Sequence, residues 1–256
     1  MRPLDGKVAI VTGGNRGIGR SIAERLARDG ARVVLCARDR TALDDTTRSI
    51  GDAARSISLD LRERGTETAL ARFALDQFGA IDIVVNNAGA TKRGDFLTLT
   101  DDDWADGYAL KLFAAVRLTR EAWPELKRRR GSVVNIAGVG GRTPGPEFSI
   151  GGSVNAAMLS FTKALADRGV GDVVQVNAIN PGPVRTERFS RRIAAEAARS
   201  GLDAAAAEAR FVEREKITRV GVPEDVANLV AFLVGPEGRL LHGALIDIDG
   251  GSTKTL

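Results

Sequence analysis

Few residues of this chain can take part in disulfide, metal or acid–base chemistry. Its 256 residues include one cysteine, one histidine and one tyrosine, which are Cys36, His242 and Tyr108. A lone cysteine cannot close a disulfide within the chain, and its place inside an apolar run suits a reducing compartment. No group of His, Cys and carboxylate residues has metal-ligand spacing, so we expect no metal site.

The sequence also lacks segments that would direct it to a membrane or to nucleic acid. No apolar stretch is long enough to span a bilayer, and no charged and apolar leader precedes the first apolar run. The net charge is only +4, from 37 basic and 33 acidic residues, which does not favour a nucleic-acid partner. We therefore expect a soluble, unprocessed, cytoplasmic protein.

Apolar runs alternate with helical patterns along the chain. The runs at 8–11, 32–36, 56–59, 81–85, 132–136, 173–179 and 244–248 have strand character, and helical periodicity covers 18–29, 39–49, 66–78, 102–129, 153–168 and 223–233. This alternation is typical of parallel strands joined by right-handed crossovers. We predict one α/β, Rossmann-like domain over residues 1–256, with a doubly wound, parallel seven-stranded sheet and helices on both faces.

A glycine-rich turn follows the first apolar run. It reads Thr12-Gly13-Gly14-Asn15-Arg16-Gly17-Ile18-Gly19 and leads into a helical pattern. A turn without side chains lets the main chain approach a pyrophosphate, and the first N–H groups of the helix then point at the anion. The position of this turn between a strand and a helix predicts a nucleotide site.

The spacing of these glycines, together with Asn86-Asn87-Ala88-Gly89, resembles the short-chain dehydrogenase/reductase family. The resemblance extends from about Gly6 to Ser252 and includes Asp60, Asn180-Pro181-Gly182 with Thr186, and Asp249-Gly250-Gly251. It implies an NAD(P)-binding oxidoreductase that acts on a carbonyl or hydroxyl group. It also implies that residues 185–219 form a mobile substrate lid, whose alanine-rich sequence leads us to expect no strong core anchor.

The end of the second strand indicates which dinucleotide binds. An acid there would accept hydrogen bonds from both ribose hydroxyls of NAD, but the sequence reads Cys36-Ala37-Arg38. Arg38 and Arg16 can instead pair with a 2′-phosphate, or they are merely solvated surface cations. We favour NADP(H), bound as NADPH, over NAD.

The full set of expected cofactor-binding residues combines the turn with the positions that the resemblance implies. Asp60 is expected to meet the adenine amino group, or alternatively to cap a helix. The set is Thr12, Gly13, Asn15, Arg16, Gly17, Ile18, Gly19, Arg38, Asp60, Leu61, Asn87, Ala88, Gly89, Pro181, Gly182, Val184 and Thr186.

The catalytic residues that the resemblance implies are replaced in this sequence. The family uses a serine, a tyrosine, a lysine four residues after the tyrosine, and an asparagine on the preceding long helix. These positions hold Gly138, Gly151, Asn155 and Lys111, and a glycine can neither donate a proton nor polarise a carbonyl. Lys111 and Asn155 look like a reciprocal exchange, so we hypothesise that the ammonium has changed helices; unrelated drift is the alternative.

Other residues could supply the missing proton. Tyr108 lies three residues before Lys111 on the same helix face, although aromatic core packing is the favoured interpretation. Ser149 and Ser153 flank Gly151 and are expected to have turn or cap roles, and His242 is expected to be a turn residue. Water polarised by Lys111 is a further source.

Two basic stretches raise the question of an acidic partner. Lys127-Arg128-Arg129-Arg130 ends a helix, where its dipole favours cations, and the lid carries Arg185, Arg188, Arg191, Arg192 and Arg199. Docking of an acidic carrier protein or of coenzyme A is the alternative to a solvated surface, with an acyl thioester as a possible small-molecule substrate. The resemblance implies a homotetramer or homodimer, with Phe113 and Phe161 as candidates for its interface or for the core.

Two functions therefore remain open. The first is an NADP(H)-dependent oxidoreductase with a non-standard active site, with Lys111, Asn155 and Tyr108 as its candidate catalytic residues. The second is a catalytically inactive nucleotide-binding protein, or a partner subunit in a hetero-oligomer with an active paralogue. We lean towards the enzyme because the nucleotide cleft is intact.

Overall fold

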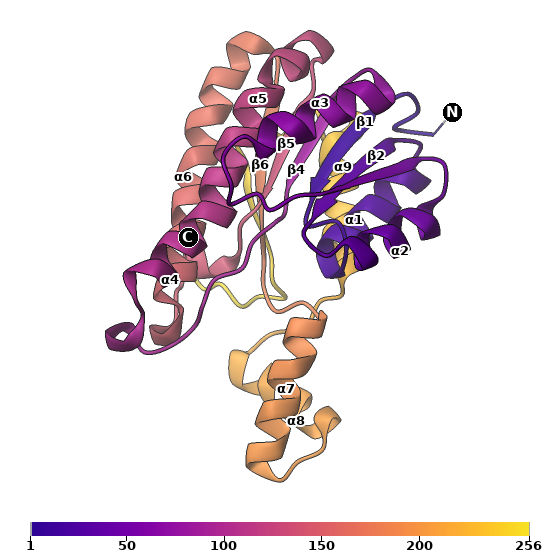
Figure 1. Cartoon of the computed structure of the whole chain (residues 1–256). Helices are drawn as coiled ribbons and strands as arrows, with labels where there is room; N and C mark the ends of the chain where they lie inside the picture. Colours follow the sequence, from indigo (N-terminus) through magenta and orange to yellow (C-terminus); the bar gives the residue numbers. More distant parts are fainter. Residues whose placement is uncertain (1, 256) are drawn as a thin grey trace.

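The computed structural model describes residues 2–255 and contains the predicted parallel sheet. Its strands are β1 (Val8–Thr12), β2 (Arg32–Ala37), β3 (Ala54–Ser58), β4 (Ile83–Asn86), β5 (Ser132–Ile136), β6 (Gln175–Pro181) and β7 (Leu245–Ile248). They lie in the order β3-β2-β1-β4-β5-β6-β7, and every pairing is parallel. The predicted seven-stranded, doubly wound sheet is confirmed (Figure 1).

Helices cover both faces of this sheet. One face packs against α1 (Gly17–Arg28), α2 (Arg40–Ile50) and α9 (Pro223–Val234). The other packs against α3 (Thr66–Phe78), α5 (Ala114–Arg129) and α6 (Ser149–Asp172), as Figure 1 shows. Burial on both faces explains why the strands read as continuous apolar runs rather than as alternating patterns.

The long helix predicted at 102–129 is interrupted. It begins as α4 (Asp101–Tyr108), passes through a π-helical turn at Ala109–Phe113, and continues as α5. A π-helical turn contains one residue more than an α-helical turn, and such turns occur frequently at functional sites. This turn contains Lys111, which the sequence had singled out.

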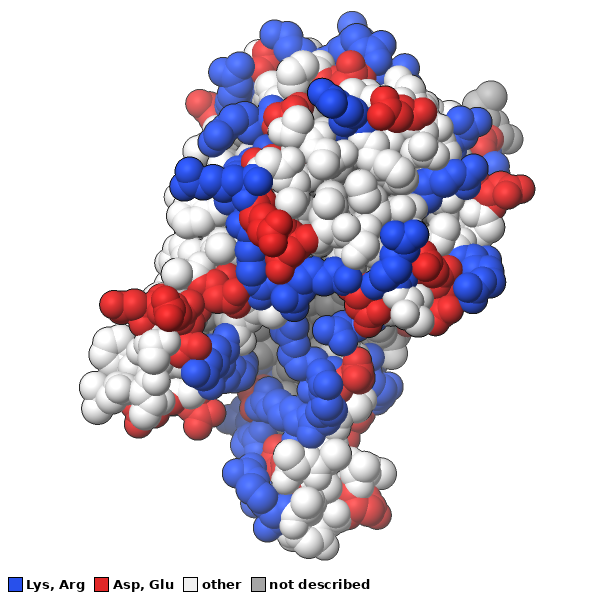
Figure 2. Space-filling view, in the orientation of Figure 1, with Lys and Arg blue, Asp and Glu red and all other residues white. Residues whose placement is uncertain are grey.

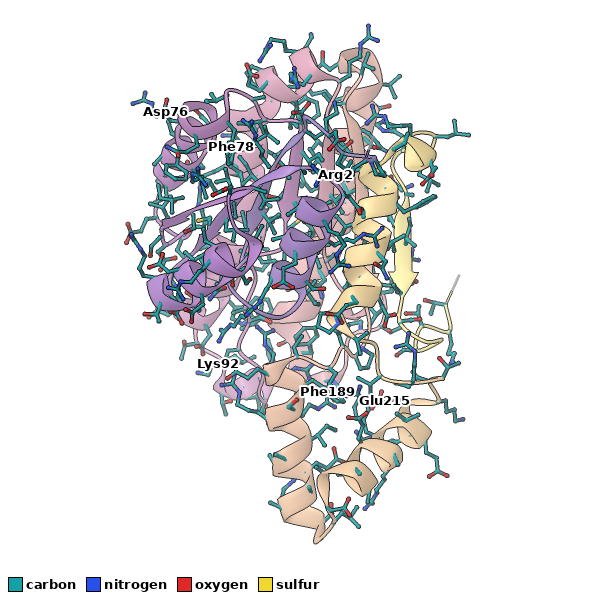
Figure 3. All side chains as sticks on the ribbon, turned by 90° about the vertical axis from the view of Figure 1, so that its right-hand side faces the viewer. Arg2, Asp76, Phe78, Lys92, Phe189 and Glu215 are labelled. Atoms are coloured by element: carbon teal, nitrogen blue, oxygen red, sulfur yellow. The ribbon has the colours of Figure 1, made fainter. Side chains whose placement is uncertain are left out.

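Residues 185–219 project from the sheet as a separate helical layer, the lid, built from α7 (Glu187–Ser200) and α8 (Ala204–Glu215) (Figure 1). The rings of Phe189 and Phe211 meet edge to face with their centroids 5.3 Å apart, and Figure 3 shows Phe189 where the lid joins the body. The lid thus has a small core of its own. This core joins the two lid helices to each other and shares no residue with the cores on the two faces of the sheet, so the mobile lid stays a prediction. The core comprises Phe189, Ile193, Ala197, Ala207, Phe211, Ile217 and Val220.

A buried carboxylate connects three elements at the amino ends of the strands. Asp82, directly before β4, is 1% exposed. Its oxygens accept hydrogen bonds from Lys7 Nζ at 3.1 Å, from the backbone N–H of Val8 at 3.0 Å and from Arg129 Nε at 3.0 Å. The starts of β1 and β4 and the end of α5 are therefore fixed by one side chain.

We predict that Asp82→Ala lowers the free energy of unfolding by about 3 kcal/mol, because it leaves two cations and a buried N–H without their acceptor. Asp76→Ala is the matched control, since Asp76 is an exposed residue of α3 that points outward in Figure 3, and it should change stability by less than about 0.5 kcal/mol. Urea unfolding measures both variants, and equal effects would contradict the role assigned to Asp82.

Candidate functional site

The candidate site lies at the carboxyl edge of the sheet, where the strand order reverses between β1 and β4. Ligands of doubly wound folds bind in the crevice at this point. The glycine-rich turn after β1 is joined here to the segment after β4. Asn87 Nδ2 donates to the carbonyl of Thr12 at 2.9 Å, and the Thr12 hydroxyl accepts from the backbone N–H groups of Asn87 and Ala88, each at 3.0 Å.

The glycines of the turn are required by close approach of the main chain. A Cβ on Gly19 would lie 2.1 Å from the carbonyl oxygen of Gly13 and 2.5 Å from Asn87 Nδ2. Gly13 itself has φ +66°, a conformation that suits glycine. No side chain caps the start of α1, so the first N–H groups of this helix are open to an anion. The geometry fits the pyrophosphate of a dinucleotide.

The two arginines expected at a 2′-phosphate border this crevice. Arg38 follows β2, and its Nη1 lies 3.5 Å from Asp60 Oδ2. Arg16 Nη1 lies 3.4 Å from Glu187 Oε2 of the lid. Both arginine side chains are about two-thirds exposed, at 64% and 66%. Exposed ion pairs of this kind contribute little free energy, so both guanidinium groups can exchange their carboxylate partners for a phosphate.

The remaining expected cofactor residues lie around the same edge. Asp60 does not cap a helix, since its carboxylate accepts from the backbone N–H of Arg62 at 3.1 Å while the residue before α3 is Gly65. Thr186 caps α7 by accepting from the backbone N–H of Phe189 at 3.5 Å. The turn residues Asn15, Gly17 and Ile18 lie at the start of α1, Leu61 and Ala88 line a hollow with Thr12, and Pro181, Gly182 and Val184 lie at the end of β6 or just beyond it.

Lys111 extends from the π-helical turn into the crevice. Its ammonium donates to the carbonyl of Ala137, directly after β5, at 2.6 Å. Its aliphatic part lies against Gly89, where a Cβ would be 3.0 Å from Lys111 Cδ. The loss of hydration on burial and the positive charge of Arg188 lower the pKa of Lys111 from 10.5 to about 8. The hollow beside it is lined by Thr12, Leu61, Asn86, Ala88, Leu110, Lys111, Ala114 and Ala115.

Asn155 approaches the same segment from α6. It is 3% exposed, and its Nδ2 lies 3.0 Å from the position that a Cβ on Gly138 would take. Among residues 2–255, no group donates a hydrogen bond to its Oδ1 or to the Oδ1 of Asn86 in the hollow beside Lys111. Lys111 and Asn155 therefore flank Ala137 and Gly138 from two different helices, and no hydrogen bond joins them to each other within the part of the chain that the structure describes.

A phenyl ring that the sequence analysis missed fills the space beside Gly151. A Cβ on Gly151 would lie 2.1 Å from both Cε2 and Cζ of Phe148, and a Cβ on Gly140 would lie 2.6 Å from Cε1 of the same ring. Phe148 precedes Gly151 by three residues, a spacing that places neighbours on one helical face and could have revealed this contact. The ring has no group that can donate a proton.

The other residues singled out from the sequence take structural positions. Tyr108 packs against the half-exposed Phe113, with ring centroids 6.3 Å apart, and the Ser153 hydroxyl donates to the carbonyl of Ile150 at 2.9 Å. His242 accepts from the backbone N–H of Val176 at 3.3 Å, and its Nε2 lies 2.7 Å from the carbonyl oxygen of Ala166. Ser149 Oγ is buried and makes no hydrogen bond within residues 2–255, so the expected capping role of Ser149 was wrong.

No group of His, Cys, Asp and Glu side chains in residues 2–255 could hold a metal ion. None of the helices in this range combines the length and apolar character that crossing a membrane requires.

The parallel sheet and the crevice at its carboxyl edge define the NAD(P)-binding fold of an oxidoreductase. Comparison with known proteins identifies the family. Residues 13–253 match the family described as Enoyl-(Acyl carrier protein) reductase. The chain is 30% identical to the 3-oxoacyl-(acyl-carrier-protein) reductase FabG of Vibrio cholerae, over 97% of this chain and 98% of that protein. It belongs to the short-chain dehydrogenase/reductase family, as its motifs predicted.

Solved structures agree with this assignment. L-sorbose reductase from Gluconobacter frateurii, complexed with NADPH and L-sorbose, superposes with a TM-score of 0.95 at 30% identity, covering all of both chains. A short-chain oxidoreductase from Pseudomonas aeruginosa, described as containing an atypical catalytic center, superposes with a TM-score of 0.92 at 28% identity and 99% coverage of each chain.

We predict that Gly151→Ala destabilises the protein by about 1–3 kcal/mol, because its methyl group would overlap the Phe148 ring. Gly171→Ala in the same helix is the control: nothing lies within 4 Å of its Cβ position, so it should be neutral or stabilising by up to about 1 kcal/mol. In thermal unfolding, Phe148→Ala should largely remove the cost of Gly151→Ala. Additive effects of the two substitutions would contradict the overlap.

Proposed function

We propose that this NAD(P)-dependent oxidoreductase reduces a carbonyl group with Lys111, rather than a tyrosine, as the group that holds the transferable proton. The observation that carries the proposal is the place of the Lys111 ammonium, 2.6 Å from the carbonyl of Ala137 at the carboxyl end of β5. The proposal treats Gly138 and Gly151 as true replacements of the family's serine and tyrosine. NADP(H) is the cofactor of this crevice, in keeping with the NADPH-bound neighbours.

The surroundings of Lys111 suit proton transfer near neutral pH. A general acid works best when its pKa lies close to the operating pH, and the pKa of Lys111 is lowered to about 8. An ammonium has three N–H donors, of which one is used by Ala137. Two donors therefore remain for a substrate oxygen.

The residues of the crevice have separate roles in carbonyl reduction. Reduced nicotinamide, when bound, supplies the hydride. The N-terminus of α1 and the glycine turn hold the dinucleotide, and Arg16 and Arg38 select its 2′-phosphate. Lys111 donates a proton to the carbonyl oxygen as that oxygen gains negative charge, and the resulting neutral amine is reprotonated from solvent. Asn155 positions the Ala137–Gly138 segment and does not transfer the proton.

A second candidate is a nucleotide-binding protein without turnover. The Phe148 ring favours it, because this ring occupies the space beside Gly151 and carries no polar atom. Under this hypothesis the chain would be a partner subunit, and the half-exposed Phe113 on the π-helical turn would lie in a homotetrameric, homodimeric or heteromeric interface. Size-exclusion chromatography with light scattering distinguishes these assemblies.

We predict that Arg38→Ala raises the dissociation constant of NADPH by about tenfold or more and leaves that of NADH within about twofold, because only NADPH carries the 2′-phosphate. Fluorescence titration of the two reduced cofactors measures both constants. Arg40→Ala is the control, since Arg40 is an exposed residue at the start of α2 that pairs with Asp44 at 3.3 Å. An equal loss of affinity for both cofactors would remove Arg38 from the phosphate site.

We predict that the rate of NADPH-dependent reduction falls as pH rises through about 8, because the protonated form of Lys111 is the acid and deprotonation at its lowered pKa removes it. Alcohol oxidation should show the opposite dependence, since it needs the neutral amine. Lys111→Met should lower kcat by about 100-fold or more and abolish this dependence, with a ketone, quinone and acyl-thioester panel as substrates.

Two results of this experiment would contradict the proposal. An unchanged pH profile in Lys111→Met would assign the proton to another group, with Tyr108→Phe as the next variant to measure. Tight NADPH binding with no oxidation of any substrate in the panel would favour the partner-subunit hypothesis.

A further inference from the structure

Arg93, in the loop after β4, is held by an aromatic ring beside the candidate catalytic position. Its guanidinium carbon lies 4.1 Å from the centroid of Phe148, the same ring that fills the space next to Gly151. The backbone N–H of Gly94 donates to the carbonyl of Glu147 at 3.1 Å, which fixes the loop against this segment. A stacked guanidinium keeps its N–H groups free at the edge of its plane.

Two arginines of the lid belong to the same group of charges. Arg188 Nη2 donates to the carbonyl of Gly89 at 3.3 Å, which connects α7 to the segment that packs on Lys111. Arg192, one helical turn later, lies over the ring of Phe211 at 4.9 Å. Burial and the positive charges of Arg192 and Arg188 lower the pKa of Arg93, against the opposing charge of Glu147.

These three arginines, which we name the arginine cluster, lack carboxylate partners among residues 2–255. Other lid arginines are paired, among them Arg185 with Glu208, Arg191 with Glu187 at 3.5 Å, and Arg214 with Glu196 at 2.6 Å, whereas Arg199 and Arg210 have no carboxylate partner among residues 2–255. Figure 2 shows Lys and Arg side chains gathered around the hollow where the lid meets the body. Like charges held close together repel each other, so a fold retains them where an anion offsets the repulsion.

The position of the cluster separates it from the cofactor phosphates. Arg16 and Arg38 border the 2′-phosphate position at the ends of β1 and β2, and the start of α1 provides the pyrophosphate position. Arg93 follows β4 and rests on Phe148, just before α6. The cluster also lies near Lys111, since Arg188 bonds to the carbonyl of Gly89, on which the Lys111 stem packs.

We infer that the arginine cluster binds an anionic group of the substrate, a carboxylate or a phosphate, while the substrate carbonyl faces Lys111. This inference rests on the proposed function and adds the substrate class to it. Arg93 and Arg192, stacked on their rings, present preformed donor edges to two oxygens of the anion. Arg188 joins the anion site to the Gly89 segment, so anion binding holds the lid against the body.

Binding of matched small probes tests this inference. The probes are levulinate, its neutral methyl ester and inorganic phosphate, titrated by calorimetry into the NADPH-loaded protein. We expect levulinate to bind at least about tenfold more tightly than its ester, and Arg93→Leu or Arg192→Leu to remove that preference. Arg199 is an exposed arginine in the last turn of α7, the helix that also contains Arg192. Arg199→Leu should retain the preference for levulinate. Tighter binding of phosphate than of levulinate would identify a phosphoester substrate.

Chemical labelling locates the binding site. Phenylglyoxal modifies accessible arginines, and mass spectrometry should show that levulinate, but not its ester, slows labelling of Arg93 and Arg192 and leaves Arg199 unchanged. The inference is overturned if neither anion binds, if the ester binds as tightly as the acid, or if Arg93→Leu weakens NADPH binding and leaves levulinate binding intact. Anion binding that depends on Arg93 in a protein without reductase activity would sustain the inference and refute the proposed function.

Discussion

The uniform direction of the strands is the constraint on which the rest of the structure depends. Because all seven strands are parallel, their carboxyl ends meet at one edge, and the segments after β1, β4 and β5 converge there. The hydrogen bonds between Thr12 and Asn87 join two of these segments. Lys111 joins the segment after β4 to the segment after β5, since its stem packs on Gly89 and its ammonium binds Ala137.

Around this edge we propose a chemistry that differs from what the family resemblance implies. An ammonium of lowered pKa stands at one side of the Ala137–Gly138 segment and a buried amide at the other. The Phe148 ring fills the space beside Gly151, and the Arg93 guanidinium stacks on the face of this ring. One aromatic side chain thus makes both contacts, which links the proposed proton donor to the proposed choice of substrate.

The fold and the cofactor crevice could be predicted from the sequence, because buried parallel strands and close main-chain approach leave local signatures in apolar runs and in glycine spacing. The site beyond the crevice could not. The three-residue spacing of Phe148 and Gly151 was the one local signal, and it applies only if the helix starts at Ser149, while Arg93 lies in a loop without periodicity. The lid core was missed because Phe189 and Phe211 are separated in sequence and are paired by the turn between α7 and α8. The roles of Lys111, Asn155 and Tyr108 in catalysis stay predictions.

The π-helical turn at Ala109–Phe113 limits which deletions this protein can accept during evolution. Because it holds one residue more than an α-helical turn, loss of a single codon there would make α4 and α5 one regular helix. Everything before the deletion would then rotate by ~100° relative to α5. Such a rotation would change how α4 meets α5, and the position of Lys111 between Gly89 and Ala137 depends on that junction.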